Sequence, residues 1–168
     1  MKRKNIFFNK LKNPYIISEI GVNHENSLEK AYKMIMLSKR GGADAVKFQS
    51  YKAENLASKF SPAYWDLKKE KTNSQLKLFK KYDKFNVNEY YKLAAFCKKK
   101  KLDFLSTPFD HESADYLSRI VPFFKISSSD ITNLPLLKHI GEKRKPVLIS
   151  TGASNLLEIT TVNSPLKL

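Results

Sequence analysis

The chain has 168 residues, of which 42% are hydrophobic, and a formal net charge of +15. This composition is typical of a folded globular protein and excludes a disordered one, and no apolar run approaches the ~20 residues of a membrane-spanning helix. The one cysteine, Cys97, excludes an intramolecular disulfide; with no secretory apolar region at the start, this predicts a cytoplasmic protein.

The positive charge comes mainly from lysine. Residues 98–101 are all lysine and end a predicted helix, where cations interact favourably with the helix dipole. Arginine binds phosphates and nucleic-acid bases better than lysine does, but it is scarce and occurs at Arg3, Arg40, Arg119 and Arg144. We therefore interpret the charge as a sign of an anionic small-molecule ligand or of a lysine-rich composition, and a nucleic-acid partner is not favoured.

In chain order, the first predicted strand covers residues 15–20. It leads through a loop to a helix that Ser27 caps and that the pair Gly41-Gly42 ends. The second strand follows at once over residues 44–49. Both strands carry a polar residue inside an otherwise apolar run, which is unusual for a strand that only fills a core.

A long connection, residues 50–73, follows the second strand and contains the one tryptophan, Trp65. Loops beyond ~12–15 residues are usually functional or disordered, and the aromatic content of this one predicts an ordered loop at the active site. The remaining predicted elements are helices at 74–81, 86–101, 111–118, 135–143 and 155–159, and strands at 102–106, 123–126 and 146–150.

Strands that alternate with helices predict an α/β fold with a parallel sheet, either open and doubly wound or closed as a barrel. No Gly-x-Gly-x-x-Gly follows the first strand, and polar residues end every strand, so we predict a (β/α) TIM-type barrel. A closed barrel needs eight strands and this chain supplies about five. We therefore expect an N-terminal extension (1–14), an incomplete barrel (15–159) and an atypical truncated tail (160–168).

Two lysines, Lys47 and Lys125, lie inside apolar runs that are predicted to be buried strands. A buried ammonium group needs an anion or loses much hydration energy. An internal salt bridge, or a lysine reaching solvent from a strand end, would also explain each of them. Together with the donors of 127–129 and 150–152, which precede helix starts, they predict a site for a doubly anionic ligand such as a phosphate ester that carries a carboxylate.

Glu19 lies in another apolar strand and is a candidate general base or hydroxyl acceptor. The alternative is an ion pair with one of the two lysines, and both can hold. His24, His111 and His139 have no recognisable metal-ligand spacing, so we do not expect a metal site made by these histidines. Cys97 lies among apolar neighbours on a predicted helix, and we expect it to be a buried residue without a catalytic role.

Six segments occur in an order that is specific to one family. The segments are 17–24 (ISEIGVNH), 43–49 (ADAVKFQ), 104–110 (FLSTPFD), 125–131 (KISSSDI), 133–137 (NLPLL) and 145–152 (KPVLISTG). Together they resemble the N-terminal barrel of the sialic acid synthase family, which includes N-acetylneuraminate, legionaminate and pseudaminate synthases. The resemblance runs from about residue 15 to 159, nearly the whole chain.

The resemblance implies the condensation of phosphoenolpyruvate with an N-acetylmannosamine-type sugar. C3 of phosphoenolpyruvate attacks the sugar's aldehyde, water adds at C2, and phosphate leaves. Glu19 and Gln49 would be the catalytic residues facing the sugar and the reacting centre, and Asn73 would contact the sugar. The residues that would hold phosphoenolpyruvate are Lys47, Thr107, Lys125, Ser128 and Ser150.

The chain also departs from the family pattern. Ser127 and Ser129 stand where glycine is common, Ala153 stands where methionine is common, and Asn26 replaces a loop glycine, a mild change because asparagine tolerates positive φ. The family's divalent metal, manganese or magnesium, is held by two histidines on later strands, so we expect no metal ligand in this chain. The family's small C-terminal domain, which reaches a neighbouring subunit in a homodimer, has no counterpart here either.

These observations leave three hypotheses. The favoured one is the N-terminal portion of a synthase that is inactive alone. The second is a half-barrel that binds phosphoenolpyruvate or a phosphosugar and acts with a partner chain, because open strand edges favour pairing. The third is a basic RNA-binding module, whose affinity would fall steeply with salt.

Overall fold

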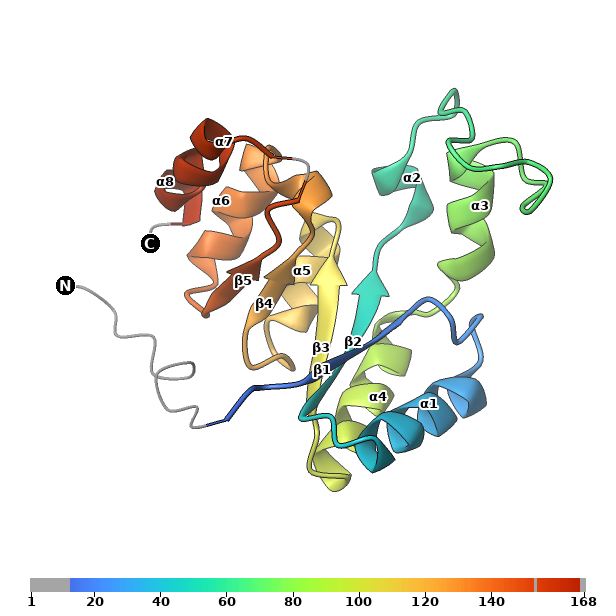
Figure 1. The fold of residues 1–168 in the computed structure, drawn as a ribbon, viewed down its shortest axis with the longest axis vertical. Coiled ribbons are helices and arrows are strands. Elements are labelled where there is room, and N and C mark those ends of the chain that lie inside the picture. Colours follow the sequence, from blue (N-terminus) through green and yellow to red (C-terminus); the bar gives the residue numbers. More distant parts are fainter. Residues whose placement is uncertain (1–12, 153, 167–168) are drawn as a thin grey trace.

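Parallel strands form the centre of the protein and helices pack beside them (Figure 1). The computed structural model describes residues 13–152 and 154–166. The strands are β1 (Ile17–Gly21), β2 (Ala45–Ser50), β3 (Asp103–Pro108), β4 (Phe124–Ile126) and β5 (Val147–Ile149). The helices are α1 (Leu28–Arg40), α2 (Ala53–Leu56), α3 (Gln75–Tyr82), α4 (Val87–Lys99), α5 (His111–Leu117), α6 (Leu134–Glu142), α7 (Leu156–Thr161) and α8 (Asn163–Leu166), with a 3-10 turn, η2 (Ser128–Asp130).

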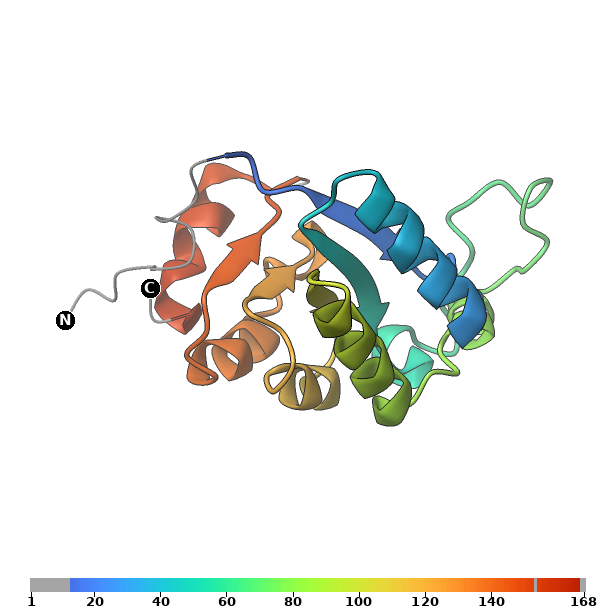
Figure 2. The same cartoon turned by 90° about the horizontal axis from the view of Figure 1, so that it is seen from below.

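The order of the strands in space follows their order in the chain. β1, β2 and β3 form one parallel sheet and β4 and β5 form a second parallel pair, with β3 in contact with β4. Figure 2 shows the main helices along one side of the curved row of strands. The predicted α/β fold with parallel strands is therefore confirmed. The strands do not form one continuous hydrogen-bonded sheet, because pairing is interrupted between β3 and β4.

The alternation of side chains along β2 positions the polar residues. Val46, Phe48 and Ser50 are buried, whereas Lys47 and Gln49 are only half-buried on the opposite face. A strand directs successive side chains to opposite faces, so one face of β2 packs into the core while the other presents polar groups.

Polar caps and buried side chains stabilise the helices. Ser27 accepts a hydrogen bond from the backbone of Lys30 at the start of α1, and Asn86 forms a capping box with Glu89 at the start of α4. Cys97 is buried, as predicted, and burial raises the pKa of its thiol to about 12. Among the helices of the described residues, none combines the length and apolarity needed to cross a membrane.

Two boundary differences have physical causes. β1 starts later than predicted and extends to Gly21, where a register shift and a φ of +58° end the strand. The sequence predicted no helix after residue 159, yet α7 runs to Thr161 and α8 follows it. Val162 and Leu166, four residues apart, are buried, and α8 contacts α6. A tertiary contact rather than helix propensity therefore orders this segment.

Gly141 allows α8 to lie close to α6. A Cβ at this position would lie 2.6 Å from the backbone oxygen of Pro165 and 2.9 Å from the Cα of Leu166. We expect Gly141→Ala to lower the free energy of unfolding by about 1–2 kcal/mol, because overpacking against backbone outweighs the gain in helix propensity. Urea unfolding measures this change.

The matched control is Gly41→Ala, whose Cβ would meet only carbonyl oxygens at 3.5 Å. An unchanged stability of Gly141→Ala relative to this control would show that α8 does not pack against α6 as described.

Candidate functional site

Lys47 and Glu19 form the centre of the polar site. Their Cα atoms are partners in the β1–β2 ladder, and the Lys47 ammonium makes an ion pair with Oε2 of Glu19. Lys47 Nζ also donates a hydrogen bond to Oγ1 of Thr107 on β3 at 3.2 Å. The Lys47 side chain is 14% exposed and that of Glu19 is 47% exposed. The alternative of an ion pair is thus confirmed, and Glu19 remains accessible from solvent.

Gly21 brings Glu19 and Gln49 close to the backbone at the end of β1. A Cβ on Gly21 would lie 3.3 Å from Oε1 of Glu19 and 3.4 Å from Nε2 of Gln49. The two side chains predicted to be catalytic therefore flank one glycine with positive φ. The sequence analysis assigned no role to Gly21. Its position at the end of a predicted strand, two residues after Glu19, was the feature that could have indicated one.

Lys125 lies on β4 and extends the polar site beyond the first sheet. Its Nζ donates to Oγ of Ser150 at 2.6 Å and to the carbonyl oxygen of Ile126 at 2.7 Å. Burial, and then the positive charge of Lys47, lower the pKa of Lys125, whereas Glu19 acts in the opposite direction. The two lysines and the carboxylate therefore influence one another across β1, β2 and β4.

The loops after β4 and β5 meet beside Lys125. Ser128 is in η2, and its Oγ would lie 3.8 Å from a Cβ built on Gly152. Ser127 caps η2 by accepting a hydrogen bond from the backbone of Ser129. Backbone N–H groups and hydroxyls at such turns suit an anion. Ser128 and Ser150 are thus on adjoining strand-end segments, as the sequence predicted for one shared face; Ala153 lies outside the described residues.

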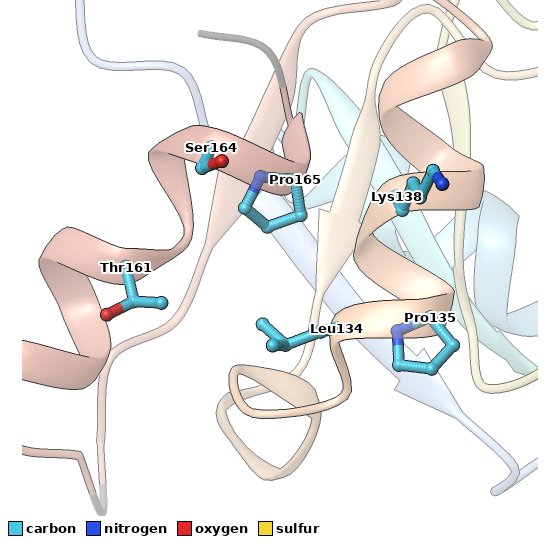
Figure 3. A pocket seen from close by; sticks show the side chains of 6 residues that line it. All are labelled: Leu134, Pro135, Lys138, Thr161, Ser164 and Pro165. Carbon is cyan, nitrogen blue, oxygen red and sulfur yellow. The ribbon is translucent and has the colours of Figure 1, made fainter.

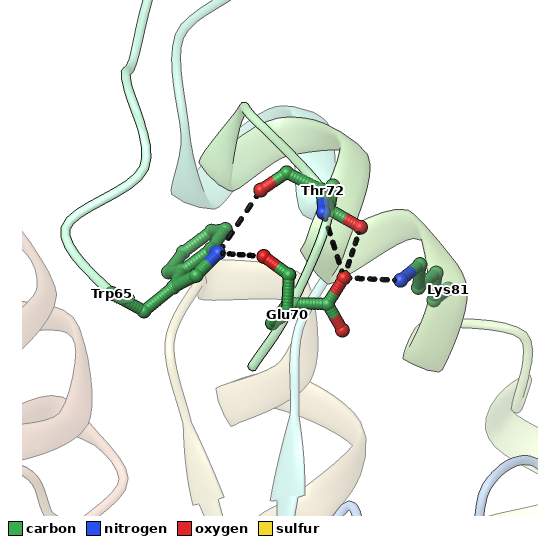
Figure 4. A network of polar contacts seen from close by, with 4 residues as sticks. All are labelled: Trp65, Glu70, Thr72 and Lys81. Atoms are coloured by element: carbon green, nitrogen blue, oxygen red, sulfur yellow. Dashed lines mark hydrogen bonds and ion pairs between the residues drawn. The ribbon is translucent and has the colours of Figure 1, made fainter. Parts of the chain in front are cut away.

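Asn73 is not joined to this cluster by the contacts of the described residues. Its side chain is exposed, and its backbone carbonyl accepts a hydrogen bond from Ala63 at 3.3 Å. The connection that contains it is ordered by polar contacts: Nε1 of Trp65 donates to the carbonyl oxygens of Glu70 at 3.2 Å and Thr72 at 3.0 Å (Figure 4). The order predicted for this connection is confirmed, whereas its place at the active site and the role of Asn73 stay predictions.

The three histidines do not come together. His24 is buried, stacks on Phe85 with ring centroids 4.4 Å apart, and accepts a hydrogen bond at Nδ1 from the backbone of Asn26. His111 and His139 lie ring to ring at 4.6 Å on α5 and α6. No group of three or more histidine, cysteine, aspartate or glutamate residues within 13–152 and 154–166 could hold a metal ion. These residues do not fit the manganese or magnesium expected from the resemblance.

A separate cavity of about 600 Å³ lies between α6 and the α7–α8 segment (Figure 3). Its lining offers one titratable group, Lys138, and no carboxylate or histidine. Although it is roomy, it lacks the paired charges of the Lys47 and Lys125 cluster, so we assign the candidate site to that cluster. The lining residues are Leu134, Pro135, Lys138, Thr161, Ser164 and Pro165.

Comparison with known proteins shows to which family the chain belongs. Residues 34–167 match the NeuB family. The chain belongs to the NeuB family. The N,N'-diacetyllegionaminic acid synthase of Campylobacter jejuni is 43% identical over 152 residues, which cover 89% of this chain and 45% of that protein. The N-acetylneuraminate-9-phosphate synthase of Drosophila melanogaster is 36% identical, over 88% of this chain and 40% of that protein.

A solved structure has the same arrangement of elements. The N-acetylneuraminic acid synthetase of Leptospira borgpetersenii, in complex with citrate, matches with a TM-score of 0.77 and 32% identity, over 92% of this chain and 50% of that one. The resemblance to the sialic acid synthase family is therefore confirmed. The chain spans about half the length of the relatives it matches.

The coupling between the lysines is testable by titration. We expect Lys47→Met to raise the pKa of Lys125, because it removes a positive charge and frees Glu19 to stabilise the remaining ammonium. NMR titration of the Lys125 side chain in isotope-labelled protein measures the shift. Lys92→Met, which removes an exposed charge paired with Glu89, is the control and leaves the pKa unchanged; an equal effect of both variants would contradict a shared site.

Burial of His24 makes stability depend on pH. Burial lowers its pKa to about 4 from 6.5, so between these values the unfolded chain binds a proton that the folded chain does not. The free energy of unfolding therefore falls as the pH drops, and His24 contributes roughly 2 kcal/mol of that loss between pH 7 and pH 5.

Urea unfolding of His24→Phe at both pH values tests this contribution. The variant is expected to lose less stability on acidification than the unmodified chain. His111→Phe, at an exposed position, keeps the full loss. Equal losses in the His24→Phe variant and the unmodified chain would show that His24 is not the responsible group.

Proposed function

We propose that this chain binds phosphoenolpyruvate as part of an enzyme that condenses it with an N-acetylated amino sugar to form a sialic-type acid. The observation that carries the proposal is the pair of partly buried ammonium groups, with Lys47 bonded to Thr107 on β3 and Lys125 bonded to Ser150 after β5. A molecule that carries both a phosphate and a carboxylate has one anionic group for Lys125 and one for Lys47, and Lys47 would then be shared between the ligand and Glu19. The names of the relatives support the same class of product.

The side chains present suit binding and proton handling. Lys47 and Lys125 would hold the anionic groups, and the hydroxyls of Thr107, Ser128 and Ser150 would orient them. During condensation, C3 of phosphoenolpyruvate forms a bond to the aldehyde carbon, the aldehyde oxygen gains a proton, water adds at C2, and phosphate leaves. Glu19, whose carboxylate lies beside Gly21, would move protons near this centre, and the amide of Gln49, on the other side of Gly21, would form hydrogen bonds there.

We propose that ligand binding, rather than turnover, is what these 168 residues accomplish by themselves. The chain spans 45% of the Campylobacter relative, and the described residues offer no ligand set for the expected divalent metal. For the whole enzyme we propose a cytoplasmic homodimer. The second candidate is a half-barrel that acts with a partner chain. Among the described strands, β1 and β5 lie at the two ends of the row, and each is hydrogen-bonded to a neighbouring strand along one edge only.

Binding of phosphoenolpyruvate by calorimetry tests the proposal. We expect Lys125→Met to weaken binding at least tenfold, because a charge-assisted hydrogen bond contributes about 1.5–3 kcal/mol. Affinity for the unmodified chain should also fall at high pH, and at a lower pH than for an ordinary lysine, because the pKa of Lys125 is lowered. Lys92→Met should bind normally.

Two outcomes would count against the proposal. Equal affinities of the Lys125→Met and Lys92→Met variants would show that phosphoenolpyruvate does not bind at Lys125. Binding that appears only when a second protein chain is added would favour the partner-dependent half-barrel.

A further inference from the structure

A cleft of about 400 Å³ lies beside the long connection, and it shares no residue with the lysine site. Three segments build it: the loop after β1, the connection between α2 and α3, and α3 itself. Its size suits a small ligand rather than a protein. The lining residues are Val22, Asn23, Glu25, Tyr64, Trp65, Glu70, Leu78 and Tyr82.

The indole of Trp65 is held in one orientation. Its Nε1–H donates to two backbone carbonyls, those of Glu70 and Thr72 (Figure 4). Tyr64 packs against it edge-on with ring centroids 5.0 Å apart. With its one donor already used, the ring offers a ligand its surface rather than a hydrogen bond. Aromatic faces attract the C–H groups of a flat apolar surface, and one side of a pyranose ring is such a surface.

The two carboxylates of the cleft are ionised and already paired. Lys81 donates to Oε1 of Glu70 at 2.8 Å, and chiefly through this bond the pKa of Glu70 falls to about 2. Lys30 donates to Glu25 and lowers its pKa in the same way. Because each negative charge has its own lysine, the cleft carries little net charge for a cationic ligand. The carboxylate oxygens can still accept hydrogen bonds from hydroxyl groups.

Asn26 ties two walls of the cleft together. Its Nδ2 donates to the carbonyl oxygen of Lys81 at 2.5 Å, and its Oδ1 accepts from the backbone N–H of Lys84 at 3.1 Å. Its φ is +61°, a backbone angle that glycine would adopt more easily but without either hydrogen bond. The asparagine therefore fixes the loop after β1 against the end of α3, and this preorganises the cleft.

We propose that this cleft binds a neutral pyranose sugar, with the ring stacked on Trp65 and its hydroxyls bonded to Glu25, Glu70 and Asn23. The site is separate from that of phosphoenolpyruvate, and its existence does not rest on the proposed function. A quaternary ammonium ligand would also suit aromatic side chains, but the paired lysines Lys30 and Lys81 and the net charge of +15 oppose it.

Trp65 provides the measurement, because it is the one tryptophan of the chain. We expect its fluorescence to change saturably on titration with N-acetylglucosamine and, at lower concentration, with N,N'-diacetylchitobiose. Tyr64→Ala, which removes a 75% exposed ring, should weaken binding at least tenfold while leaving calorimetric binding of phosphoenolpyruvate unchanged. Asn26→Gly should also weaken sugar binding, because it keeps the backbone angle and removes the tether.

Phe60→Ala is the matched control, since Phe60 is 93% exposed in the same connection and does not line the cleft. It should bind both sugars normally. The proposal is overturned if neither sugar changes the fluorescence, if Tyr64→Ala and Phe60→Ala bind equally well, or if choline saturates the signal while the sugars do not. The Lys125→Met variant tests only the binding of phosphoenolpyruvate and does not affect the fluorescence measurements with sugars. Each of the two proposals can therefore be contradicted without the other.

Discussion

The ion pair between Glu19 and Lys47 is the interaction around which the site is arranged. It exists because β1 and β2 are parallel and in a register that places the two residues side by side. Moving the register by one residue would turn Lys47 into the core and leave its ammonium without a partner. Lys125 then completes the site from β4, and its pKa is lowered first by burial and then by the positive charge of Lys47.

The same end of the sheet supports two kinds of surface. Around the lysines, charge and hydroxyl groups suit a small anion, and the backbone turns of the following loops add N–H donors. Around Trp65, aromatic rings and paired carboxylates suit an uncharged ligand. The long connection therefore forms one wall of the cleft as well as linking β2 to α3, and the hydrogen bonds of Trp65 to Glu70 and Thr72 help to order it.

The strands, the main helices and the residue types at strand ends could be predicted because they depend on short-range patterns. Lys47, Thr107, Lys125 and Ser150 were expected at one face, and hydrogen bonds now join them in pairs, Lys47 to Thr107 and Lys125 to Ser150. Asn73 was expected to contact the sugar, but no contact of the described residues joins it to these four; it lies in a long irregular connection, which has no periodicity from which its path can be predicted.

The sequence by itself determined the parallel α/β fold, the family, and the polar residues that strand ends would carry, since hydrophobic periodicity and motif order are local properties. Tertiary structure alone decided that Glu19 pairs with Lys47 rather than with Lys125, that α8 packs on α6 beside Gly141, and that three distant segments enclose the Trp65 cleft. These features depend on contacts between residues far apart in the chain, and such contacts form only when the packed elements bring those residues within reach.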